Sequence, residues 1–215
     1  MPDLSLGIIL ISITLLGYIS NWLNWKYLDY HFMHWLYYVG AFVHETSHAA
    51  LCVVTGATIE EFVVFSDQPH VTHQKSRLPL LGEPLIAFAP IAGGLLFLFL
   101  VNHYVLRNHF VVPQFSLIGM HWQIIFKASF AFLGELRLFS WQSWVMAFLF
   151  FNVGAMIGPS FQDLKNIWLP VILLFFVQSP FLANWGLHAV VFIIANIILQ
   201  LFVIFGLWLY HFMFS

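Results

Sequence analysis

Residues 44–48 read HETSH, inside the otherwise apolar run YYVGAFVHETSHAALCVV. In a helix, positions i and i+4 lie on the same face, so His44 and His48 can present two imidazole nitrogens to one metal ion. Glu45 is adjacent in sequence and can reach a water molecule on that metal without binding the metal itself. Two zinc ligands and a general base are the chemistry of the H-E-x-x-H pattern. The segment therefore predicts a catalytic zinc centre.

A third ligand must come from elsewhere, because catalytic zinc usually has three protein ligands and one open position. The chain has four aspartates, which are Asp3, Asp29, Asp67 and Asp163. Counting the expected membrane crossings places HETSH and Asp163 on one side of the membrane and Asp29 on the other. Asp3 is close to a terminus, and Asp67 is on the correct side but in a polar loop. We expect Asp163 to be the third ligand, with Asp67 as its competitor.

The composition is that of a membrane protein, since 61% of the 215 residues are hydrophobic and only 7% are charged. Soluble domains carry roughly 25% charged residues. The net charge of −2 gives no indication of nucleic-acid binding, and a single cysteine, Cys52, excludes an internal disulfide. An ionisable residue near the bilayer centre costs about 2.5–3.5 kcal/mol. Three such residues within five positions therefore indicate a functional site.

Six apolar stretches are of the length needed to cross a bilayer, about 20 residues. They cover approximately residues 4–20, 30–55, 79–103, 141–159, 166–183 and 188–213. The segment between the third and fourth stretches is apolar but broken by proline, glycine and charges, which is typical of an interfacial or half-inserted helix. We predict one integral membrane domain over residues 1–215, an all-α polytopic fold with about six transmembrane helices. The first stretch is expected to be a retained helix and not a cleaved signal.

The loop after the second stretch differs from the others. TIEEFVVF, residues 58–65, is rich in β-branched and aromatic residues, and the SDQP that follows is a turn signal. We expect either a short strand or hairpin against the helices, or an ordinary polar loop. His70 and His73 in this loop could bind a metal or gate access to it, but loop histidines are more often solvated.

The chain resembles the site-2 protease family of intramembrane zinc metalloproteases. The resemblance rests on AFVHETSHAALCVVTGATI, on IAFAPIAGG and on FNVGAMIGPSFQDLKN, and it covers roughly residues 35–166. It implies one Zn²⁺ per chain held by His44, His48 and Asp163, with Glu45 as the catalytic base. The family's asparagine upstream of the aspartate, which helps to hold substrate, corresponds to Asn152.

The resemblance implies an endopeptidase that hydrolyses a peptide bond in or near a transmembrane segment of a membrane-protein substrate. The chain would then be a multi-pass protein of the lipid bilayer, in the cell membrane if its source is prokaryotic. Two alternatives belong to other classes. One is a non-catalytic membrane scaffold or assembly factor that keeps the protease fold. The other, weaker one is a membrane di-iron oxidase or desaturase, suggested by HFMH, HETSH and HVTH but lacking an HxxHH box.

Overall fold

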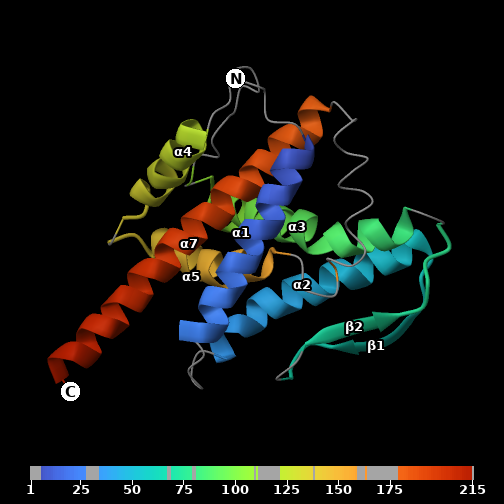
Figure 1. The fold of residues 1–215 in the computed structure, drawn as a ribbon, viewed down its shortest axis with the longest axis horizontal. Coiled ribbons are helices and arrows are strands. Elements are labelled where there is room, and N and C mark those ends of the chain that lie inside the picture. Colours follow the sequence, from blue (N-terminus) through green and yellow to red (C-terminus); the bar gives the residue numbers. More distant parts are fainter. Residues whose placement is uncertain are drawn as a thin grey trace.

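The structure is a computed structural model, and it describes residues 6–27, 34–66, 69–78, 81–108, 110, 122–137, 139–158, 163 and 179–214. Within these residues the chain forms six α-helices, one π-helical turn and two strands (Figure 1). In chain order they are α1 (Leu6–Tyr27), α2 (His34–Thr55), β1 (Ile59–Val63), β2 (His70–His73), α3 (Gly82–Leu100), the π-helical turn (Val101–Val105), α4 (Trp122–Gly134), α5 (Trp141–Met156) and α7 (Pro180–Phe214).

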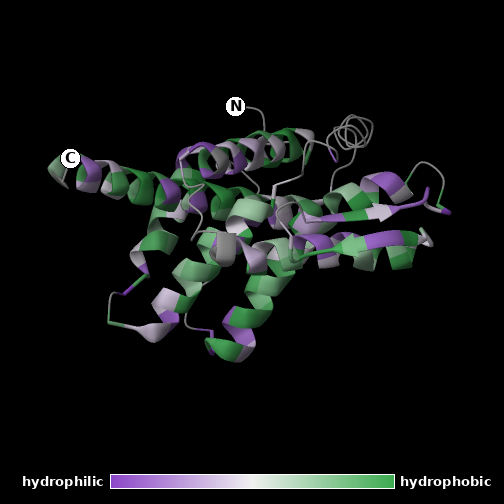
Figure 2. Ribbon diagram, turned by 90° about the horizontal axis from the view of Figure 1, so that it is seen from below, coloured by the Kyte–Doolittle hydropathy of each residue, from purple (hydrophilic) through white to green (hydrophobic). Residues whose placement is uncertain are grey.

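Three of the described helices are long and apolar enough to cross a membrane. These spans are Leu6–Asn24 in α1, Gly82–Val105 in α3 and its π-helical extension, and Pro180–Met213 in α7. The chain is thus a mostly helical membrane protein, and the helices are predominantly hydrophobic (Figure 2). Six transmembrane helices are not confirmed, since α5 has 16 residues and the expected stretch 166–183 lies mostly outside the described residues.

Helix α2 is 22 residues long, as is α1, but it is not among these three spans. Its length is sufficient, so its polar residues, chiefly HETSH, are what lower its hydropathy below that of a typical span. Helix α4, between the third and fourth expected spans, has 13 residues, which at 1.5 Å per residue is too short to cross the hydrocarbon core of about 30 Å. A short helix was expected there.

Of the two structures expected after the second helix, a hairpin or a polar loop, the hairpin is confirmed as a two-stranded antiparallel sheet. Helix α2 ends in a Schellman motif: Gly56, with φ +72°, donates to the Val53 carbonyl, and the next amide donates to the Cys52 carbonyl at 2.8 Å. The chain returns to this end of α2, where the Ser76 hydroxyl donates to the Thr55 carbonyl at 3.0 Å. The sheet is therefore held against α2. Its strands carry several polar residues (Figure 2).

Helices α1 and α7 pack side by side and run parallel (Figure 1). Gly186 near the start of α7 approaches Ile9 near the start of α1, and further along the Gln200 amide donates to Asn24 Oδ1 at 2.8 Å. The Gln200 amide also donates to Ser20 Oγ at 3.1 Å. Buried amides and hydroxyls are a common means of joining helices in lipid.

Helix α2 packs against both α3 and α5. Its approach to α3 depends on Gly93, because a Cβ at this position would overlap Ser47. Its approach to α5 depends on Gly40, where a Cβ would overlap the carbonyl of Asn152. These glycines therefore allow the backbones of α3 and α5 to lie close to α2, the helix that carries HETSH.

Candidate metal centre

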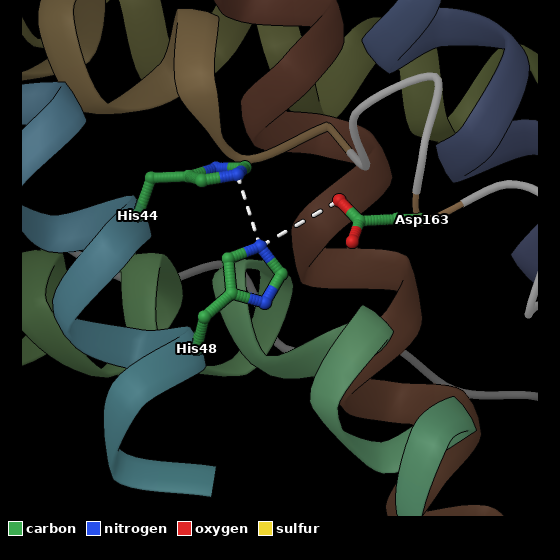
Figure 3. A group of neighbouring side chains, drawn as sticks. All are labelled: His44, His48 and Asp163. Atoms are coloured by element: carbon green, nitrogen blue, oxygen red, sulfur yellow. Dashed lines mark hydrogen bonds and ion pairs between the residues drawn. The ribbon is translucent and has the colours of Figure 1, made fainter. Parts of the chain in front are cut away.

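His44 and His48 lie one turn apart on α2, and their side chains point in the same direction (Figure 3). Both residues are buried, with 9% and 8% of their surface exposed. Their Nε2 atoms are 3.2 Å apart. The i, i+4 spacing thus brings the two imidazoles together as expected from the sequence.

The other ring nitrogen of each histidine meets a backbone carbonyl of a neighbouring helix. His44 Nδ1 lies 2.6 Å from the Met156 carbonyl oxygen at the end of α5, and His48 Nδ1 lies 2.8 Å from the Ile86 carbonyl oxygen of α3. A carbonyl only accepts, so each Nδ1 carries the proton and donates it. When both rings are neutral, each has its lone pair on Nε2, and the two lone pairs face one another. This repulsive arrangement is relieved by a cation between them, and histidines that bind metals are oriented in this way.

Asp163 approaches the histidines from the opposite side (Figure 3). Its Oδ2 is 3.6 Å from His48 Nε2, and one ligand atom from each of the three residues lies within 4.8 Å of the others. Two ligands at about 2.0–2.1 Å from a tetrahedral ion are roughly 3.3 Å apart, close to the 3.2 Å and 3.6 Å separations here. Two imidazoles and one carboxylate are also a donor set that zinc takes in catalytic sites.

The competing aspartate, Asp67, lies outside the described residues, as do Asp3 and Asp29. Among the described residues, the group that could hold a metal ion consists of His44, His48 and Asp163. The structure therefore brings together the three residues selected from the sequence as ligands. Their binding of a metal stays a prediction.

Glu45 is 7% exposed and adjoins the two histidines on α2. Its carboxylate is within electrostatic reach of His48, Asp163 and His70. It is not part of the three-residue ligand group, which the H-E-x-x-H pattern requires of a base. On the hairpin, His70 Nε2 lies 3.4 Å from Glu61 Oε2, and neither His70 nor His73 belongs to the ligand group.

Asn152 lies on the face of α5 that packs against α2, and it is 1% exposed. Its amide donates to the Phe148 carbonyl, one turn earlier on the same helix, at 2.7 Å. Its side-chain oxygen has no hydrogen-bond partner within the described part of the chain. The structure thus places Asn152 close to the site helix, and its expected role in holding substrate stays a prediction.

Two features of the site were missed from the sequence, namely the carbonyl groups of Ile86 and Met156. Backbone atoms carry no residue-type signal, so neither position stands out in a search for polar side chains. An indirect signal exists for each one. Pro90 follows Ile86 by four residues, and the GP pair at residues 158–159 follows Met156 closely.

A sequence model of the family described as Peptidase M50B-like matches residues 13–127, just over half of the chain. The chain belongs to this family. The matched region includes HETSH and the α3 segment with Pro90 and Gly93, and it ends before Asn152 and Asp163. No curated protein and no solved structure matches the chain.

Proposed function

We propose that this M50B-like peptidase is a zinc-dependent intramembrane endopeptidase that cleaves a membrane-protein substrate in or near its transmembrane segment. The observation that supports this most strongly is the convergence of two histidine Nε2 atoms and the Asp163 carboxylate at a buried H-E-x-x-H helix. Ionisable residues buried within a membrane protein usually mark a functional site.

His44 Nε2, His48 Nε2 and an Asp163 carboxylate oxygen would hold one Zn²⁺ per chain. Three protein ligands leave one coordination position for water or substrate. When bound, the ion lowers the pKa of water toward about 7 and polarises a scissile carbonyl. The Ile86 and Met156 carbonyls hold the two rings so that each Nε2 would be available to the ion.

Glu45 would act as the general base and acid. Its carboxylate accepts a proton from the attacking water and then delivers this proton to the amine that leaves when the peptide bond breaks. Its burial beside the ligand group keeps bulk water away from this transfer. Gln at this position has the same shape but cannot accept the proton.

The substrate would be a transmembrane segment that unwinds locally, since the hydrogen bonds of an intact helix shield its carbonyl groups. The β1–β2 hairpin could pair with the unwound segment by strand addition. Its position supports this proposal, because β1 and β2 contact α2 and His70 on β2 is within electrostatic reach of Glu45. Asn152 is a further candidate for holding the substrate.

The test compares wild type, Glu45→Gln and the matched control Glu135→Gln, whose carboxylate follows α4 outside the site. Each protein is reconstituted into lipid vesicles with a panel of single-span membrane proteins, and cleavage products and zinc content are measured by mass spectrometry. We expect one zinc in all three proteins and cleavage in all but Glu45→Gln. Wild type that holds no zinc after reconstitution with the metal would refute the metalloprotease proposal.

The non-catalytic scaffold is distinguished by the same experiment. It predicts that wild type and Glu45→Gln are indistinguishable, with zinc bound and no cleavage by either protein. A di-iron oxidase would instead be identified by iron in place of zinc.

A further inference from the structure

Proline 90 lies in the interior of α3, away from both ends of the helix. A residue at this position normally donates its N–H to the carbonyl four residues earlier, which is that of Ile86. Proline has no N–H, and its ring pushes the carbonyl of residue i−4 away from the helix axis. The Ile86 carbonyl is therefore without its normal helical donor.

The Ile86 carbonyl oxygen is also the atom that meets His48 Nδ1, at 2.8 Å. Both Ile86 and His48 are buried, so an unpaired carbonyl and an unpaired imidazole N–H would each be costly here. The hydrogen bond between them satisfies both groups. It also fixes the ring with its Nε2 toward His44 and Asp163.

His44 obtains its carbonyl by a different means. Met156 is the last residue of α5, and the last four carbonyls of a helix have no partner within it. His48 instead meets a carbonyl before the last turn of α3, where each carbonyl would otherwise be paired within the helix. A carbonyl becomes available there because residue 90 is a proline.

We propose that Pro90 is a positioning residue for the metal centre: by lacking an N–H, it frees the Ile86 carbonyl to orient His48. This inference rests on the proposed function, because it assigns a role in binding the same metal. Pro90 touches neither metal nor substrate and acts through Ile86 and His48. Restoring the N–H would draw the carbonyl back to the helix axis and make it share its oxygen between two donors.

The decisive comparison is between alanine and its α-hydroxy analogue, lactic acid, at position 90 of the full chain. Pro90→Ala restores the N–H, whereas the lactic acid variant has an ester oxygen there and also lacks the proline ring. Pro84→Ala is the matched control, since Pro84 is in the first turn of α3, where the N–H of an α-helix has no intrahelical partner.

Three properties of each detergent-solubilised protein are measured. These are the zinc affinity by competition with a chromophoric chelator, the visible d–d absorption of the Co²⁺-substituted protein, and the thermal unfolding of the metal-free protein. We expect Pro90→Ala to bind zinc roughly tenfold or more weakly, as for loss of an outer-shell partner, with an altered Co²⁺ spectrum. Its metal-free thermal stability should change little, because the helical hydrogen bond that the substitution adds offsets the weakened bond from His48.

The lactic acid variant and Pro84→Ala should both match wild type in affinity and Co²⁺ spectrum. Zinc-binding wild type together with an unchanged Pro90→Ala would overturn this inference and leave the proposed function intact. A lactic acid variant as weak as Pro90→Ala would also overturn it, because the ring and not the missing N–H would then matter. Wild type that binds no zinc would overturn both proposals.

Discussion

Gly93 on α3 contacts Ser47 on α2, so the two positions can be exchanged in size by combining Gly93→Ala with Ser47→Gly. This exchange tests whether the close approach of the two helices sets the geometry of the site. A Cβ added to Gly93 would overlap Ser47 Oγ and would lie 2.7 Å from Ser47 Cβ. Ordinary contact between carbon atoms is about 3.5–4.0 Å. Gly93→Ala must therefore move α3 away from α2 by about 1 Å. Ser47 adjoins His48, so this displacement separates His48 from the Ile86 carbonyl of α3.

The magnitudes follow from this displacement. Overpacking of this kind costs about 1–3 kcal/mol of stability, and a 1 Å misplacement of catalytic groups can reduce the rate about 100-fold. Ser47→Gly alone should cost about 1 kcal/mol, as glycine does inside a helix. In the double variant the nearest atom to the new Cβ is the Cα of residue 47 at 3.7 Å, which is ordinary contact.

We therefore expect Gly93→Ala combined with Ser47→Gly to regain most of the stability and activity that Gly93→Ala loses. The assay is a double-mutant cycle of thermal unfolding in detergent, with zinc content and cleavage rate measured in parallel. The expected coupling between the two positions is about 1–3 kcal/mol, within the range for residues in contact. Additive effects of the two substitutions would show that the close approach at Gly93 does not set the site geometry.

Three other perturbations have expected outcomes. Asp163→Asn should weaken zinc binding by more than the roughly 10–100-fold that is typical when a partner of a ligand is lost, whereas Asp67→Asn should change it little. Competition with a chelator measures both affinities. A larger loss in Asp67→Asn than in Asp163→Asn would assign Asp67 as the ligand. Gly40→Ala should lower stability by about 1–3 kcal/mol in thermal unfolding, because its Cβ overlaps the Asn152 carbonyl, and unchanged stability would refute this contact. Gln200→Leu should lower stability by about 1–3 kcal/mol, since buried oxygens of α1 lose a donor, and a gain would contradict this.

The ligand group was accessible from the sequence because ionisable residues are rare in so apolar a chain. HETSH fixed two positions by helical spacing, and the crossing count favoured Asp163 among four aspartates. The hairpin was accessible because β-branched residues and a turn signal follow the second helix. The carbonyls of Ile86 and Met156 were not, because which backbone groups meet the histidines depends on how α3 and α5 pack against α2.

The last expected span covers approximately residues 188–213, whereas the helix that contains it, α7, begins at Pro180. The expected gap between the last two stretches, residues 184–187, lies inside α7. In the structure His188 Nδ1 donates to the Asn184 carbonyl within the helix, and Gly186 packs against α1. The true start had a signal, since Ser179 precedes a proline and its hydroxyl accepts from the Leu182 amide.

The parallel packing of α1 and α7 determines how the two ends of the chain are distributed between compartments. Each helix is long and apolar enough to cross a bilayer. Because they lie side by side and parallel (Figure 1), we expect both to cross it in the same direction. The chain between Tyr27 and Pro180 must then return to the face where α1 begins, which takes an odd number of crossings. We therefore expect an odd total, whereas six crossings would make the first and last spans antiparallel. Reporters fused before Leu6 and after Phe214 should consequently be exposed on opposite sides of the membrane.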